Sequence, residues 1–312
     1  MIDIKHVLCP VDFSTFSRYA LEQAIQVARW FKSTLTVLHV YPPPAAPPPV
    51  LFGGLPGPLP IEPFPPLTVS PERTREEVTA ALGQFVAQVD TTGVVVCLDA
   101  RAGSPVRTIL DVAEEISSDL TVLGTHGHSG FDRWVLGSVT EKVLRKARWP
   151  VLTVPPPLTE PPPDVLRLLK RILCPVDFSE SSMKALEYAL TLAKEADAEL
   201  VLMHVIEGLA DLEHWEQLTN TSIVEYLRLS EKQALTRLRE VVPKDARTWC
   251  TPKELLVTGK PHEEILRAAR EQDIHLIVMG VHGRNPIDLL LFGSTTQQVV
   301  RASTCPVLTL KG

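Results

Sequence analysis

The chain has 312 residues, of which 45% are hydrophobic and 22% are charged, a composition typical of globular proteins rather than disordered or fibrous ones. That length allows two domains, each with its own hydrophobic core. A formal net charge of -6, with no basic run and no aromatic platform, argues against a nucleic-acid partner. The start of the chain lacks a secretion signal and no apolar run could span a bilayer, so we expect a cytoplasmic protein without membrane contact.

An internal duplication begins with the first strand. Residues 7–14 read VLCPVDFS, and residues 172–179 read ILCPVDFS. A short apolar run that ends in Asp and continues with Phe-Ser is typical of a buried strand leading into a helix, with the serine at the N-cap. Each half of the chain therefore begins with a predicted strand and helix, capped by Ser14 or Ser179.

The later patterns also occur twice and in the same order. Predicted strands and helices alternate at 34–41, 72–89, 94–100, 106–117, 120–124 and 150–154 in the first half, and at 199–206, 223–242, 254–257, 262–271, 276–280 and 306–310 in the second. A further helix opens at Gly137 and at Gly293. This alternation predicts the α/β class: two tandem Rossmann-like domains of flavodoxin-like order 3-2-1-4-5, each a five-stranded parallel sheet with helices on both faces.

Proline marks the expected boundaries. Many of the 28 prolines lie in 42–71 and 155–163, which is typical of extended connectors. We predict one domain over 1–154 with a Pro-rich insert at 42–71, a linker over 155–169 and a second domain over 170–312. The insert is either a mobile flap, or a lid over a ligand or an arm for a partner.

The most informative motif, G-x2-G-x9-G-S, occurs once in each half, starting at Gly124 and at Gly280. A strand that leads into glycines and then into Gly-Ser at a helix start can bring backbone N–H groups close to an anion, so we predict a phosphate site in each half. With strand order 3-2-1-4-5, Asp12 or Asp177 at the end of the first strand would face this motif. The alternatives are that the glycines only shape a turn and that each Asp only caps its helix.

Two other candidates carry less weight. His126 and His128 look like a metal pair, but two histidines without a third ligand predict no metal site, and a polar role near the phosphates is favoured. The five cysteines are odd in number and lack CxxC spacing, which argues against disulfides and thiolate zinc. Cys9 and Cys174 occupy equivalent positions, so a redox role stands as the alternative to simple packing.

Taken together, these residues resemble the universal stress protein family in its tandem two-domain form. The similarity covers 5–154 and 170–310 without the insert, and its specific marks are the Pro-Val-Asp strand end, the glycine motif and the closing Trp-Pro-Val-Leu or Cys-Pro-Val-Leu strand. Members with the complete motif bind ATP, so the resemblance implies ATP, or ADP or AMP, in both halves, with any Mg²⁺ held through the phosphates.

The resemblance also implies residue roles. Asp12 and Asp177 would contact the ribose or adenine region. The base would be lined by Pro10, Val11, Val40 and Leu123, and by Pro175, Val176, Val205 and Met279. The phosphates would be held by Gly124, Gly127, Gly137, Ser138 and Val139, and by Gly280, Gly283, Gly293, Ser294 and Thr295. This chain departs from the family by Phe13 and Phe178, where a small residue is common, and by Thr295-Thr296 in place of Val139-Thr140.

For function, the sequence favours an ATP-binding regulatory protein of the stress response, because a binding motif is present without a Walker lysine or a kinase catalytic loop. A slow ATPase or phosphotransferase, with an Asp or a loop histidine positioning water, is the alternative, so whether the protein is an enzyme stays open. A nucleotide-free scaffold is a third hypothesis. By analogy with single-domain relatives, we predict that the last strands of the two halves pair in an intramolecular pseudo-dimer; a further homodimer is left open.

Overall fold

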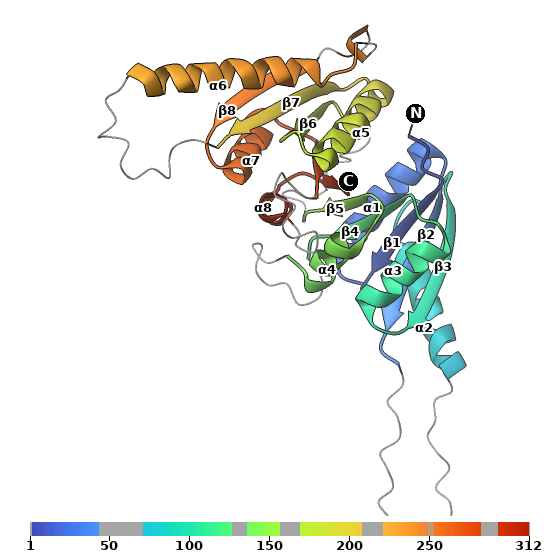
Figure 1. Ribbon diagram of the computed structural model, residues 1–312. Helices are drawn as coiled ribbons and strands as arrows, with labels where there is room; N and C mark the ends of the chain where they lie inside the picture. Colours follow the sequence, from blue (N-terminus) through green and yellow to red (C-terminus); the bar gives the residue numbers. More distant parts are fainter. Residues whose placement is uncertain are drawn as a thin grey trace, which may run out of the picture.

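The computed structural model describes residues 2–43, 71–126, 136–156, 169–207, 221–244, 246–248, 250, 252–281 and 293–311. Within these residues, strands and helices alternate in the same order in two successive halves (Figure 1). We call the part from β1 to β5 half one and the part from β6 to β10 half two. Most of the predicted insert and linker lies outside the described residues.

Half one contains β1 (His6–Val11), α1 (Thr15–Phe31), β2 (Thr34–Tyr41), α2 (Pro71–Val86), β3 (Val95–Ala102), α3 (Pro105–Glu115), β4 (Leu120–Gly124), α4 (Ser138–Lys146) and β5 (Val151–Val154). Half two contains β6 (Arg171–Pro175), α5 (Glu180–Ala196), β7 (Glu199–Ile206), α6 (Thr221–Glu240), the short helix η3 (Ala246–Thr248), β8 (Lys253–Thr258), α7 (Pro261–Glu271), β9 (Leu276–Gly280), α8 (Ser294–Ala302) and β10 (Val307–Leu310).

Most predicted bounds are off by a few residues at the ends, whereas β2, β4, β7 and β9 match residue for residue. The helix predicted over 72–89 ends at Val86 because the next amides form tighter turns, from Gln88 N to Phe85 O at 3.3 Å and from Val89 N to Val86 O at 3.1 Å. The strand predicted over 94–100 runs two residues further, since Arg101 and Ala102 still pair with β2.

The described strands form one sheet of ten, in the order β3-β2-β1-β4-β5-β10-β9-β6-β7-β8. Pairing is parallel within each half, which confirms the order 3-2-1-4-5. The predicted pairing of the two last strands is also confirmed, because β5 and β10 pair antiparallel with Leu152 opposite Leu308. Figure 1 shows β5 beside the C-terminal end of the chain.

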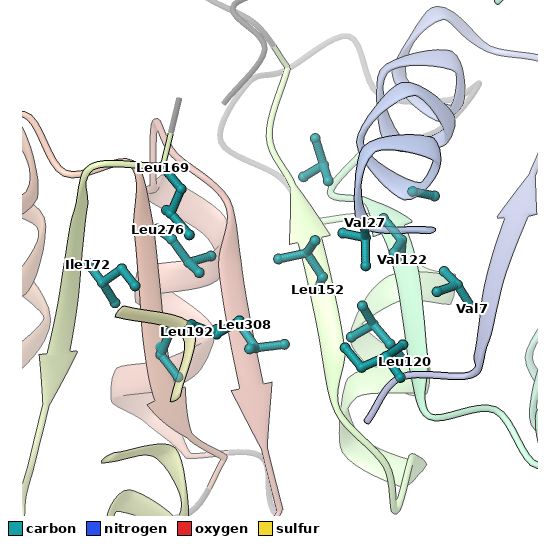
Figure 2. Close-up of a cluster of buried hydrophobic side chains, with 14 of the residues drawn as sticks. Val7, Val27, Leu120, Val122, Leu152, Leu169, Ile172, Leu192, Leu276 and Leu308 are labelled. Carbon is teal, nitrogen blue, oxygen red and sulfur yellow. The ribbon is translucent and has the colours of Figure 1, made fainter. Parts of the chain in front are cut away.

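Each face of the sheet has its own hydrophobic core. On one face, α1, α2, α5 and α6 contribute buried residues, and on the other face α3, α4, α7 and α8 do so. Figure 2 shows the first core where the halves meet, with Leu152 of β5 and Leu308 of β10 among buried side chains from both halves. This arrangement confirms helices on both faces. Among the described helices, none is both long and apolar enough to cross a bilayer.

Candidate functional site

Asp12, the acidic residue predicted to contact the nucleoside, lies between the end of β1 and the start of α1. Ser17 N donates to Ser14 Oγ at 3.1 Å, which confirms Ser14 as the N-cap. Asp12 Oδ1 accepts from Ser14 N at 3.1 Å and from Ser14 Oγ at 2.5 Å. The carboxylate therefore holds the N-cap residue Ser14 in place and supports the start of α1 through it.

Half two repeats this junction. Ser182 N donates to Ser179 Oγ at 3.3 Å, and Asp177 Oδ1 accepts from the backbone and side chain of Ser179 at 3.0 and 2.6 Å. Phe178 has φ 67° and its counterpart Phe13 has φ 64°, in the left-handed region. A bulky residue is uncommon there, so the hydrogen bonds of Asp and Ser on either side hold a costly turn in both halves.

Two histidines that the sequence analysis did not single out support these phenylalanines. The His39 ring is stacked on Phe13 with centroids 4.1 Å apart, and the His204 ring lies 4.7 Å from that of Phe178. Nδ1 of His39 is 2.8 Å from Val11 O, and Nδ1 of His204 is 2.6 Å from the equivalent carbonyl of Val176. Since a carbonyl only accepts, Nδ1 carries the proton in both rings.

The residues expected around a base lie on neighbouring strand ends. Because β1 pairs with both β2 and β4, it brings together Pro10, Val11, Val40 and Leu123. Likewise β6 lies between β7 and β9, so half two brings together Pro175, Val176, Val205 and Met279. These groups are apolar, and most of their members are buried or half-buried. The two predicted sets thus lie on neighbouring strands, but Val11 and Val176 pack in the core of the α1 and α5 face, whereas Val40, Leu123, Val205 and Met279 belong to the core of the other face.

The first glycine of each motif is required by packing. A Cβ on Gly124 would lie 3.2 Å from Phe16 O at the start of α1. At Gly280 it would lie 2.5 Å from Ser181 Oγ and 2.7 Å from the Ser181 carbonyl carbon. The ends of β4 and β9 therefore touch the starts of α1 and α5, and in half two the approach is too close for any side chain.

The third glycine of each motif opens a helix that has no side-chain cap. The amide of Gly137 donates to Thr125 O at 2.8 Å, and that of Gly293 donates to Val281 O at 3.1 Å. These two glycine N–H groups already have a hydrogen-bond partner inside the protein. The N–H groups that each helix start can offer to a ligand are therefore those of the first turn. They belong to Ser138 and Val139 in α4, and to Ser294 and Thr295 in α8, and such amides have no partner within the helix.

The middle of each motif lies outside the described residues, which includes Gly127, Gly283 and His128. His126 is described and is 7% exposed, with Nδ1 2.9 Å from Thr125 Oγ1. Its Nε2 is buried and has no hydrogen-bond partner in the described part of the chain. No group of three potential metal-ligating side chains occurs among the described residues.

The cysteines at equivalent positions are packing residues in this structure. Cys9 and Cys174 are completely buried in the core shared by α1 and α5. Burial raises the pKa of both thiols far above its usual range, which keeps them protonated. A protonated buried thiol is a poor nucleophile, so these residues do not support the redox alternative.

Comparison with known proteins agrees with this architecture. A model of the universal stress protein family matches residues 3–155 and again 169–311. The universal stress protein MJ0531 of Methanocaldococcus jannaschii is 31% identical over 150 residues, which cover 46% of this chain and 83% of that protein. A universal stress protein of Mycolicibacterium smegmatis is 26% identical over 98% of this chain and 96% of its own length.

A solved structure shares the whole fold. The crystal structure of a universal stress protein from Archaeoglobus fulgidus is 22% identical and aligns over 99% of both chains with a TM-score of 0.63. The family match covers both halves, and each half has the strand order 3-2-1-4-5. The chain therefore belongs to the universal stress protein family, in its tandem two-domain form.

Proposed function

We propose that this protein binds an adenine nucleotide, foremost ATP, at the carboxyl edge of each half and acts as a nucleotide-dependent regulatory protein in the stress response. One observation carries the proposal. In each half, the amide of Gly137 or Gly293 binds the residue that follows the central strand, so a helix without a side-chain cap starts at the end of the strand that pairs with β1 or β6.

The helix start supplies the attraction for phosphate. Amides of the first turn point outward from the helix, and the macrodipole places about half a positive charge at that end. Ser138 and Ser294 are exposed and add a hydroxyl donor to each helix start. In half two the first turn of α8 contains no acidic residue, whereas α4 has Glu141 in its first turn. Both ends therefore suit an anion, and half two has less opposing charge.

The junction and strand ends supply contacts for the nucleoside. A carboxylate is a multiple hydrogen-bond acceptor and suits a ribose hydroxyl. Asp12 and Asp177 place such a group at the end of β1 and β6, next to the serines that they bind. The apolar groups on β1, β2 and β4, and on β6, β7 and β9, suit the faces of a base.

Calorimetric titration of ATP tests the proposal. Ser138→Asp and Ser294→Asp add a negative charge that suits a helix start but repels phosphate. We expect two sites in the wild type, a loss of about tenfold or more in affinity at one site in each variant, and weakening of both in the double variant. Ser104→Asp is the control, since it makes the same change at the start of α3, which follows β3, and two strands lie between β3 and β4.

Wild-type protein without saturable ATP binding, or a double variant that binds as tightly as the wild type, would contradict the proposal. Titrations of ADP and AMP then show how far the phosphates contribute. Phosphate release in the same samples separates regulation from catalysis. Sustained release that Asp12→Ala with Asp177→Ala abolishes, while ATP binding persists, would replace the regulatory proposal with a slow ATPase.

A further inference from the structure

A pocket of about 310 Å³ lies between α1 and α2 of half one. Its lining comprises Phe13, Ser14, Thr15, Arg18, Ala81, Gln84, Phe85 and Gln88. The helices α1 and α2 pack on one face of the sheet, whereas α4, which carries the glycine helix start, packs on the other. None of the described residues proposed to hold the phosphates lines this pocket, and its volume is within the range of small-molecule pockets.

The two halves can be aligned at this place by their buried residues. Leu82 of α2 and Leu238 of α6 are both 0% exposed, and each is followed four residues later by a buried valine. Ala81 in half one therefore corresponds to Arg237 in half two. The Arg237 guanidinium carbon lies 4.2 Å from the centre of the Phe178 ring, so this side chain covers the phenylalanine of half two. The methyl group of Ala81 is too short to do so.

Half one carries its arginine on the opposite wall. Arg18 lies four residues after the N-cap Ser14, and the residue four after Ser179 is Met183. Among the described residues, no carboxylate lies within salt-bridge distance of Arg18, whose guanidinium is 5.8 Å from the Tyr19 ring. Glu22 interacts with Arg18 only at longer range, and burial raises the pKa of Glu22 against the opposing effect of Arg18. The pocket thus has a cation that no close carboxylate neutralises.

The remaining walls of the pocket suit the flat part of a ligand. The Phe13 and Phe85 rings meet edge to face with centroids 5.5 Å apart, and both line the pocket. Thr15, Gln84 and Gln88 add hydroxyl and amide groups around them. Aromatic walls bind flat apolar groups, and a guanidinium binds a carboxylate with two parallel hydrogen bonds.

We propose that this pocket binds a small aromatic carboxylate, with the carboxylate at Arg18 and the ring against Phe13 and Phe85. This site is additional to the nucleotide sites and exists in half one only, because Arg237 covers the equivalent phenylalanine in half two.

The test uses indole-3-carboxylate as the probe, followed by its NMR line widths and shifts, with indole-3-carboxamide as the uncharged counterpart. Two variants copy residues of half two into half one, so both side chains suit this backbone. Wild-type protein should bind the carboxylate at least tenfold more tightly than the carboxamide. Arg18→Met should remove that preference, and Ala81→Arg should abolish binding of both compounds. Unchanged urea midpoints show that the variants are folded.

A reciprocal variant sharpens the test. Arg237→Ala combined with Met183→Arg should give the chain a second equivalent of bound carboxylate in half two. The proposal is overturned if the wild type binds the two probes equally or not at all, or if Ala81→Arg binds like the wild type. It is also overturned if ATP displaces the carboxylate competitively, because the pocket would then be part of a nucleotide site. ATP binding that fails while carboxylate binding succeeds would refute only the proposed function.

Discussion

In half one, Phe13 lies between His39 and Phe85 beside an open pocket, whereas in half two Phe178 lies between His204 and the guanidinium of Arg237. Both phenylalanine rings contact a histidine. Their second contact differs, because it is Phe85 in half one and Arg237 in half two. The shared Asp and His side chains are held by hydrogen bonds to the main chain at the strand end. A substitution of these residues would therefore disturb the turn. What differs comes from side chains of α2 and α6, which include the buried Phe85 and the exposed positions Ala81 and Arg237. The duplicated fold can therefore carry two different surfaces over one common junction.

The largest expected effect concerns the ends of β4 and β9. A Cβ at Gly280 would lie 2.7 Å from a backbone carbon of Ser181, whereas at Gly124 the nearest atoms are 3.2 Å away. We expect Gly280→Ala to lower the free energy of unfolding by about 3 kcal/mol and Gly124→Ala by about 1 kcal/mol, because backbone cannot move aside as a side chain can. Urea unfolding with hydrogen exchange in each half measures both. Equal losses would show that the two helix–strand contacts are equally tight.

The next effect tests what the halves share. Ser14→Ala and Ser179→Ala each remove the N-cap bond and a donor to the adjacent Asp, so each should lower the free energy of unfolding by about 1 kcal/mol. Ser104→Ala is the matched control, because Ser104 sits at the N-cap of α3 without a side-chain cap bond. It should stay within about 0.5 kcal/mol of the wild type. A clear difference between the first two variants would contradict the equivalence of the junctions.

A smaller effect tests what the halves do not share. Arg237 is exposed, so its contact with the Phe178 ring should contribute about 0.5–1 kcal/mol. A double-mutant cycle with Arg237→Ala and Phe178→Leu isolates that coupling. The control cycle uses Arg239, which pairs instead with Glu254 at 2.8 Å and should show no coupling to Phe178. Zero coupling for Arg237 would mean that this side chain does not cover the ring in solution.

Much of the fold could be predicted from sequence because the duplication gives each pattern twice. The apolar runs of β4 and β9 are bounded by polar residues and glycine, so their ends were predicted correctly. Helix ends were predicted less well, since the extra turn after Val86 depends on hydrogen bonds that no residue pattern announces. The role of Asp12 at the helix start was open in the sequence, and its hydrogen bonds with Ser14 show that it supports the N-cap residue.

The features that the sequence analysis missed depend on residues that carry no motif. A histidine within an apolar strand is usually a packing residue, and only its recurrence, as Leu-His-Val and Met-His-Val, could have singled out His39 and His204. The pair Ala81 and Arg237 could not be aligned from sequence, because α2 and α6 share little pattern. Their equivalence required the burial of Leu82 and Leu238, which is a property of the folded chain.

The smallest expected effect is a pH dependence at the start of β9, where His275 replaces the Asp119 of half one. Asp119 N and His275 N make equivalent bonds to carbonyls of the first strand, at 2.9 and 3.0 Å. The Asp119 carboxylate also accepts from Lys5 N and His6 N at 2.7 and 3.0 Å. His275 Nδ1 is buried, and the described residues offer it no hydrogen-bond partner.

Desolvation lowers the pKa of His275, and Arg171 and Lys170 act in the same direction against the opposing charge of Asp273. Because its pKa is lower in the folded protein, His275 binds a proton more readily in the unfolded chain as the pH falls. The free energy of unfolding should therefore decrease as the pH drops below about 6.5. His275→Asp should make that fall shallower, because an aspartate can accept from the amides of Lys170 and Arg171 as Asp119 does in half one. Urea midpoints at about pH 7.5 and about pH 5.5 measure the difference between the two proteins, in which the other titrating groups cancel. A variant whose midpoint falls as steeply as that of the wild type would show that His275 is not the group responsible.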